Sequence, residues 1–283
     1  MGNIKDIKTR IESITSTRQI TKAMKMVAAS KLRKAQEKIL AARPYADYIN
    51  DMLVKIKFKN LVSEHKVFNP AEFGKRLILI VTADRGLCGA FNYNIIKQAA
   101  EVLENEKPTE IVCVGKKGFD FFKKQDFTMK THFVDLFNEM DFSKSVDICS
   151  SFFDDYLKGI YNEVHVVYNE FKSAIEQNIV SKKLLPIEPH HAEKISPLDY
   201  IYEPSAEEII EELAHKYIDV EIWRILLESS AAEQGGRMTA MDNATENASD
   251  LISSLTLQYN RERQAKITTE IIEIVSGAEA INQ

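Results

Sequence analysis

The stretch from residue 205 to the C-terminus contains no proline, and its only glycines are Gly235, Gly236 and Gly277. Because proline is the strongest helix breaker and the stretch is rich in Ala, Leu, Glu, Ile and Gln, it predicts one uninterrupted helix. At 1.5 Å per residue this helix would extend roughly 120 Å, several times the length of an ordinary globular-protein helix. A rod of that length needs a partner, and this requirement constrains the rest of the chain.

Apolar residues of this stretch recur at steps of three and four residues, or their multiples, as in the seam of a coiled coil. Arg224, Gln234 and Thr245 interrupt the seam, which predicts irregular packing. The seam residues are Leu213, Tyr217, Val220, Leu227, Ala231, Met238, Met241, Ala248, Ile252, Leu255 and Tyr259.

The last turns are apolar on more than one face. Two readings are open: these residues form an ordinary core, or they occupy a socket that surrounds the helix. Their position at the end of an extended rod favours the socket. The residues are Ile267, Ile271, Ile272, Ile274, Val275 and Ala278.

A second long helix is predicted from the N-terminus to about residue 57, with a bend at Pro44, because Ile4, Ile7, Ile11 and Ile14 are spaced for one helix face. Residues 1–57 carry thirteen Lys or Arg against five Asp or Glu, and residues 205–283 carry fifteen acids against six bases. This complementary charge and simple loop closure favour an antiparallel pair. The alternative is two unrelated amphipathic helices on one globular domain.

The middle of the chain alternates between short branched apolar runs and helical patterns, which is typical of an α/β domain with a mostly parallel sheet. Strands are predicted at residues 77–82, 111–115, 128–133, 164–168 and, at an edge, 179–187. Helices are predicted at residues 92–105, 116–124 and 146–161. The predicted organisation is an N-terminal coiled-coil helix (1–57), a linker (58–76), a Rossmann-like domain (77–204) and a C-terminal coiled-coil helix (205–283).

Composition excludes several classes of function. Mean hydropathy is −0.24, and no apolar run approaches the roughly 20 residues that span a bilayer, so direct bilayer insertion is not expected. A net charge of −5 argues against a nucleic-acid binder. The three distant cysteines, Cys88, Cys113 and Cys149, are expected to be buried thiols rather than a zinc or redox site.

The turn after the first strand, residues 82–90, is the best candidate for chemistry because a glycine-rich turn before a helix can hold phosphate. Its glycines, at positions 86 and 89, match neither GxGxxG nor GxxxxGK[ST]. A tight turn with a structural Asp84 is the better interpretation. No nucleophile, base and metal set is recognisable, so no cofactor, metal or catalytic residue is predicted.

Two motifs identify a family. Residues 267–280, ITTEIIEIVSGAEA, closely resemble the C-terminal signature of the gamma subunit of F-type ATP synthases. Residues 20–31, ITKAMKMVAASK, resemble the N-terminal motif of the same family. On the residues alone, the lysines and methionines of the second motif fit either a solvated coiled-coil face or a surface that docks against acidic partners.

The resemblance implies a central-stalk rotor shaft of a bacterial, proton-translocating ATP synthase, without a catalytic site of its own. It implies a hexameric ring of alpha and beta subunits, an epsilon subunit and the c-ring of the membrane sector as partners. It places the complex at the cytoplasmic face of the bacterial plasma membrane, as a peripheral assembly. Residues matched to contacts with the ring are Met24, Lys25, Arg237, Gln264, Thr268 and Glu270, and those matched to the foot of the shaft are Tyr202 and Glu203.

Overall fold

Two long helices dominate the secondary structure, α1 (Ile4–Phe58) and α6 (Ala206–Ile281). The helix predicted for the C-terminal stretch is confirmed, and it passes through Gly235 and Gly236 without interruption. Pro44 lies inside α1 and does not end it. The computed structural model describes residues 4–58, 65–104, 108–138, 140–173, 176–188, 203 and 205–281.

The chain divides into two compact units, and both long helices contribute to each. One unit comprises Met1–Val27 and Met238–Gln283, and the other comprises Ala28–Arg237. The four-part organisation inferred from the sequence stays a prediction.

The larger unit contains a five-stranded sheet of order β3-β2-β1-β4-β5. The first four strands are parallel, and β5 pairs antiparallel with β4 at one edge, which confirms the predicted, mostly parallel α/β sheet. Nearly every residue of β1 is buried, because helices cover both faces of a parallel sheet. The strands are β1 (Lys75–Val81), β2 (Thr109–Val114), β3 (Thr128–Phe133), β4 (Tyr161–Phe171) and β5 (Gln177–Leu185).

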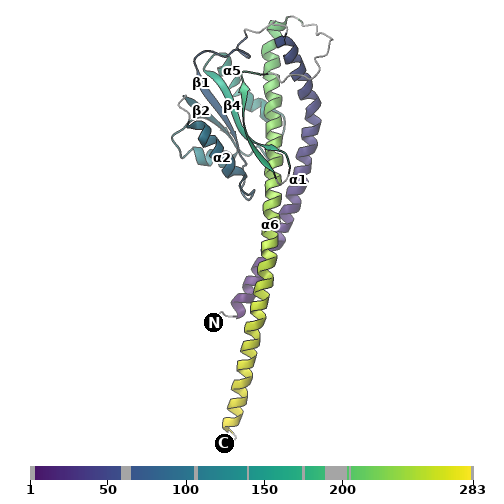
Figure 1. Ribbon diagram of the computed structural model, residues 1–283, viewed down its shortest axis with the longest axis vertical. Coiled ribbons are helices and arrows are strands. Elements are labelled where there is room, and N and C mark those ends of the chain that lie inside the picture. The colour runs from purple at the N-terminus through teal and green to yellow at the C-terminus, as the bar shows by residue number, and fades with distance from the viewer. Residues whose placement is uncertain are drawn as a thin grey trace. The chain divides into compact units, whose positions relative to one another are not determined.

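Different helices cover the two faces of the sheet. Helices α2 (Phe91–Leu103) and α3 (Lys116–Phe122) pack with Ile78 and Ile80 of β1 on one face. The other face, which carries Leu77 and Leu79, packs against segments of α1, α4, α5 and α6. Figure 1 shows α2 on the opposite side of the strands from α6. The long helices are therefore part of this core.

The helix predicted at residues 146–161 is wrong. The chain forms two short helices there, α4 (Ser143–Ser150) and α5 (Phe153–Leu157), and Tyr161 already begins β4. Gly159 has a φ of +82°, a conformation that glycine adopts readily and that ends the helical path. The strand predicted at residues 164–168 is also longer, because antiparallel pairing with β5 extends β4 to Phe171.

Candidate functional site: the terminal helix pair and the brace of α6

The terminal helix pair, defined as residues 4–27 of α1 and 238–281 of α6, is held by polar contacts near residues 27 and 238. Thr21 Oγ1 and Thr245 Oγ1 lie 2.8 Å apart, and Lys25 Nζ donates to Asp242 Oδ1 at 2.6 Å. The partners run in opposite directions along the two helices, as expected for antiparallel pairing. Thr245, which interrupts the predicted seam, is therefore matched by a hydroxyl on the facing helix.

Met24 and Lys25 of α1, matched by the family resemblance to ring contacts and called the collar from here on, lie at the margin of this pair. Met24 is half-buried. The side chain of Lys25 is 40% exposed and that of its partner Asp242 is 56% exposed. An ion pair this exposed contributes little to stability, so Lys25 can exchange its carboxylate partner at small cost. The neighbouring Met26 and Val27 are 68% and 57% exposed, and they add apolar surface beside the charge.

The C-terminal end of α6 is exposed on all sides. Every residue from 263 to 278 is exposed, although this segment contains the strongly apolar turns that the sequence analysis singled out. A row of large exposed aliphatic side chains is uncommon on a folded chain and marks an interaction surface. This apolar tip consists of Ile267, Ile271, Ile272, Ile274 and Val275, which are between 47% and 70% exposed.

The remaining predicted contacts on the tip are also exposed. Thr268 Oγ1 donates to the carbonyl of Gln264 at 2.9 Å, and the Glu270 carboxylate lies 3.8 Å from Lys266 Nζ. Both interactions lie within one helix. The outward atoms of Gln264, Thr268 and Glu270 are therefore accessible to a partner, and their assignment as ring contacts stays a prediction.

Arg237, the other residue matched to the ring, lies in the larger unit and is engaged inside the chain. Its Nη2 donates to the carbonyl of Gly86 at 3.0 Å and to Glu233 Oε1 at 2.6 Å. The side chains of Arg237 and Glu233 are only 11% and 5% exposed. Burial raises the pKa of Glu233, and the attraction of Arg237 offsets this only in part. Arg237 thus braces α6 against the turn that follows β1.

Gly236 brings α6 close to the same turn. A Cβ at this position would lie 2.6 Å from Gln177 Nε2 and 2.9 Å from the carbonyl oxygen of Cys88. Such distances are too short for a side chain, so the absence of one permits the approach. The sequence analysis recognised the glycine pair but not this packing role, because Cys88 and Gln177 are distant in sequence.

The turn after β1 is organised by Asp84. Its Oδ1 accepts hydrogen bonds from the backbone N–H of Lys116 and of Asp135, at 3.0 and 2.9 Å. Its Oδ2 accepts a third from Phe137 N–H at 3.4 Å. Lys116 opens α3, and a helix N-terminus is where phosphate commonly binds in such folds. A carboxylate of the chain itself engages that position, which confirms the structural role predicted for Asp84.

Arg224, a second interruption of the seam, lies in a buried network of charges. Its guanidinium contacts Glu221 Oε2 and Glu228 Oε1, each at 3.0 Å, and Lys182 Nζ donates to Glu221 at 2.7 Å. The network borders a cavity of about 340 Å³ between segments of α1 and α6 within the larger unit. The irregular packing predicted at Arg224 is therefore confirmed, and it includes a cavity lined by both polar and apolar side chains.

Of the two residues predicted at the foot, Tyr202 lies outside the described residues. Glu203 is exposed.

The family-model comparison matches residues 3–281 to a family described as ATP synthase. Curated relatives cover the whole chain: the ATP synthase gamma chain of Chloroherpeton thalassium is 44% identical over 302 residues, covering 100% of this chain and 99% of the relative. The chain belongs to the ATP synthase gamma chain family. The gamma chain of Pelodictyon phaeoclathratiforme is 47% identical over 289 residues, with 99% of each chain covered.

Solved structures agree with this membership. A chain from the central stalk and c-ring structure of the Tetrahymena thermophila mitochondrial ATP synthase has a TM-score of 0.63 and 26% identity. That match covers 80% of this chain and 99% of the other. A chain from the rotor of the Euglena gracilis mitochondrial ATP synthase has a TM-score of 0.65 and 21% identity. The match covers 93% of this chain and 98% of the other, and at this identity it supports the fold alone. Within the described residues, no helix combines the length and apolarity needed to cross a bilayer.

Proposed function

We propose that this chain is the central-stalk subunit of an F-type ATP synthase and couples rotation of the membrane ring to ATP synthesis and hydrolysis at the beta subunits. Full-length identity of 44 to 47% to bacterial gamma chains supports this assignment. The observation that carries it is the apolar tip, because a helix end exposed on every side needs a partner that surrounds it.

The tip is assigned to a socket formed by the ring of alpha and beta subunits. At 100° per residue, Ile267, Ile271, Ile274 and Val275 share one face of the helix, and Ile272 lies beside that face. The apolar arc is therefore broad, and the socket is assigned to enclose it together with the exposed polar residues of the same turns. Gln264, Thr268 and Glu270 lie on the same turns and are assigned to polar contacts at the rim of the socket.

Met24 and Lys25 are assigned to contact with an acidic loop of the beta subunits. The Lys25–Asp242 ion pair is half exposed, so a carboxylate from a partner can compete for the ammonium without a large loss of stability in the shaft. Met24 adds a flexible apolar contact that adapts as the partner changes. This collar would bind each beta subunit in turn.

Arg237 is assigned a double role as brace and ring contact. Its intramolecular bonds to Gly86 and Glu233 support the role of brace, and the ring contact rests on the family resemblance. Tyr202 and Glu203 are assigned to the foot, in contact with the epsilon subunit or the c-ring. The whole chain is placed at the cytoplasmic face of the bacterial plasma membrane through these partners.

The coupling mechanism rests on asymmetry. Three identical beta subunits in a symmetric ring would bind nucleotide equally, and a shaft with unlike sides contacts each of them differently. It shifts a site between open and closed states only by the difference between its contact energies in those states. Converting a mostly open site to a mostly closed one takes about 5 kcal/mol, which a few charge-assisted hydrogen bonds and apolar contacts can supply. Catalysis itself is assigned to the beta subunits, with no cofactor on this chain.

The proposal is tested by attaching a probe to this chain in an assembled complex with alpha and beta subunits. Cys88, Cys113 and Cys149 are buried, so a cysteine introduced at the exposed Glu203 is the preferred labelling site. ATP addition is expected to rotate the probe in steps. The control for specific labelling is the complex that keeps Glu203 and so lacks the introduced cysteine. ATP hydrolysis by the labelled complex without rotation of the probe would contradict the proposal.

A further inference from the structure

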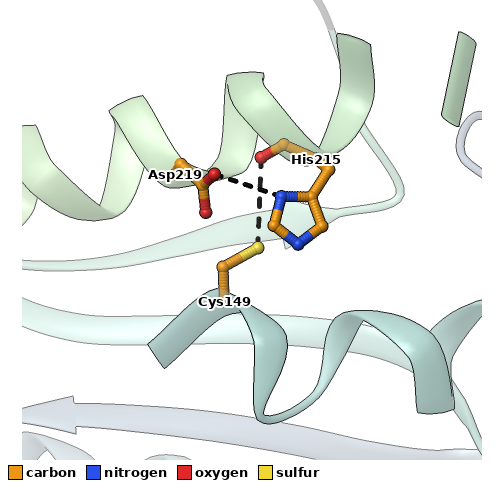
Figure 2. A group of neighbouring side chains, drawn as sticks. All are labelled: Cys149, His215 and Asp219. Carbon is orange, nitrogen blue, oxygen red and sulfur yellow. Dashed lines mark hydrogen bonds and ion pairs between the residues drawn. The ribbon is translucent and has the colours of Figure 1, made fainter. Parts of the chain in front are cut away.

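Three side chains that can bind metals converge in the larger unit. Cys149 lies on α4, and His215 and Asp219 lie one turn apart on α6 (Figure 2). One ligand atom from each of the three residues lies within 4.8 Å of the other two. His215 Nδ1 and Asp219 Oδ2 are 3.1 Å apart, and the ring of Phe153 packs edge-on against the imidazole at 4.9 Å. The imidazole is thus held in position from two sides.

Asp219 contributes a buried carboxylate to the cluster. The Asp219 side chain is 7% exposed, and its Oδ1 has no hydrogen-bond partner in the described part of the chain. In Figure 2 this oxygen is turned toward Cys149. Buried carboxylate oxygens normally have a partner. Among the described residues, this oxygen therefore lacks a partner, which a bound cation would supply.

Cys149 contributes a buried thiol to the cluster. The thiol interacts with the Asp219 carboxylate and contacts the carbonyl oxygen of His215 at 4.0 Å, the long end of the range for sulfur. Burial raises the pKa of this thiol, and the nearby Asp219 carboxylate raises it further. A thiol binds a metal as the thiolate, so a bound cation would displace its proton.

We propose that Cys149, His215 and Asp219 form a binding site for a divalent transition metal, with Zn²⁺ the preferred ion. Zn²⁺ takes a mixture of thiolate, imidazole and carboxylate ligands, whereas Mg²⁺ and Ca²⁺ prefer oxygen ligands alone. When the ion binds, the thiol releases its proton to solvent and a sulfur–metal bond forms. The thiolate and the carboxylate then carry two negative charges, which balance the two positive charges of the ion in the buried site.

The geometry is close to that of a tetrahedral site. Metal–ligand bonds of roughly 2.0 to 2.3 Å place ligand atoms roughly 3.5 Å apart, so the side chains would close by about 1 Å. The His215 side chain is 30% exposed, which leaves a path for the ion and room for a water as the fourth ligand. The bound ion would tie α4 to α6. The sequence predicts buried thiols and no metal at the three cysteines. Cys149 and His215 are 66 positions apart, and no motif joins them.

The test uses the full-length chain, stripped with a chelator and titrated with Zn²⁺ against a chromophoric competitor. One equivalent is expected to bind, and Co²⁺ in place of Zn²⁺ is expected to give a thiolate-to-metal charge-transfer band. Cys149→Ser should abolish that band and weaken Zn²⁺ binding by more than the roughly 10- to 100-fold that loss of an outer-shell partner costs. The isosteric Asp219→Asn should weaken binding while preserving the packing.

Cys113→Ala is the matched control, because Cys113 is equally buried but lies in the cluster beside α2 and α3. It should keep both the charge-transfer band and the Zn²⁺ affinity. Circular dichroism of each variant checks folding, and if Cys149→Ser is unfolded the decision rests on Asp219→Asn and His215→Gln. Binding by the parent chain that is no tighter than binding by these two variants would overturn the proposal.

Discussion

Lys25 Nζ lies 2.6 Å from Asp242 Oδ1, and this ion pair joins α1 to α6 in the terminal helix pair. Because both side chains are about half exposed, Lys25→Ala is expected to change the free energy of unfolding of the isolated chain by less than about 1 kcal/mol. In the assembled enzyme the same change should lower ATP-driven ion pumping more than it lowers ATP hydrolysis. Chemical denaturation and paired activity assays measure the two effects.

Met24→Lys tests the same contact more strongly, because it places a like charge beside Lys25. It should impair coupling without impairing folding of the chain. The matched control is Lys22→Met, which makes the reverse exchange at an exposed position of the same helix. If pumping and hydrolysis fall in proportion in Met24→Lys, or if neither changes, the collar assignment is wrong.

The two glutamates that flank Arg224 are expected to have opposite effects on stability as pH changes. Burial raises the pKa of Glu228 above its ordinary value of 4.5, despite the attraction of Arg224. Its stabilising contribution is therefore present below pH 4.5 and is lost as pH rises through the raised pKa. Glu228→Gln should remove this loss, so its stability relative to the parent chain should increase as pH rises from 4.5 through the raised pKa of Glu228. Urea denaturation at several pH values measures the difference.

Glu221→Gln provides the opposite case. Burial opposes ionisation of Glu221, but Arg224 and Lys182 overcome it and hold the pKa below its ordinary value of 4.5. The stability that Glu221 contributes is present above pH 4.5 and is lost as pH falls through the lowered pKa. Glu221→Gln should therefore be destabilised at neutral pH and approach the parent chain in acid. If the stability of the two variants changed with pH in the same way, the network would not shift the pKa values of Glu221 and Glu228 in opposite directions.

Local pattern was enough to predict the long helices and the sheet. The proline-free stretch predicted α6, and the continuous run of β-branched and other apolar residues at 77–82 predicted β1. Each signal is contained in adjacent residues. The composition of residues 146–161 is compatible with one helix, but the chain leaves helical geometry at Phe152, with a φ of −138°, and again at Gly159, with a φ of +82°. Composition does not reveal the first of these breaks.

Contacts between distant segments could not be predicted in the same way. The sequence identified Asp84 and Arg237 as single positions but did not reveal that Asp84 caps α3 or that Arg237 binds the carbonyl of Gly86. The partner of Lys25 is 217 positions away, and that of Cys149 is 66. Register between the two long helices fixes the first pairing, and the packing of α4 on α6 fixes the second.

Gly236→Ala is expected to destabilise the chain although alanine is the better helix former. The added Cβ would meet the carbonyl oxygen of Cys88 at 2.9 Å, and a backbone atom cannot easily move aside. Gly277→Ala is the control, because a Cβ there would meet no atom of the described chain within 4 Å. That variant should gain up to about 1 kcal/mol from helix propensity. Thermal unfolding of both variants tests the prediction, and equal gains would contradict close packing at Gly236.

Removing apolar side chains from the tip should affect the assembled complex and leave the isolated chain unchanged. Ile271 and Ile274 are 55% and 70% exposed, so Ile271→Ser with Ile274→Ser should change the free energy of unfolding by no more than about 0.5 kcal/mol for each substitution. The same double variant should lower the temperature at which the complex with alpha and beta subunits dissociates, because the socket would lose two buried aliphatic contacts.

Glu273→Gln is the matched control for the tip, because it changes an exposed polar residue between the two isoleucines. It should leave complex stability close to that of the parent. Native mass spectrometry across a temperature series measures dissociation directly. A complex as stable with the double serine variant as with the parent chain would mean that the exposed aliphatic residues are not enclosed by the ring, and the socket would have to be abandoned.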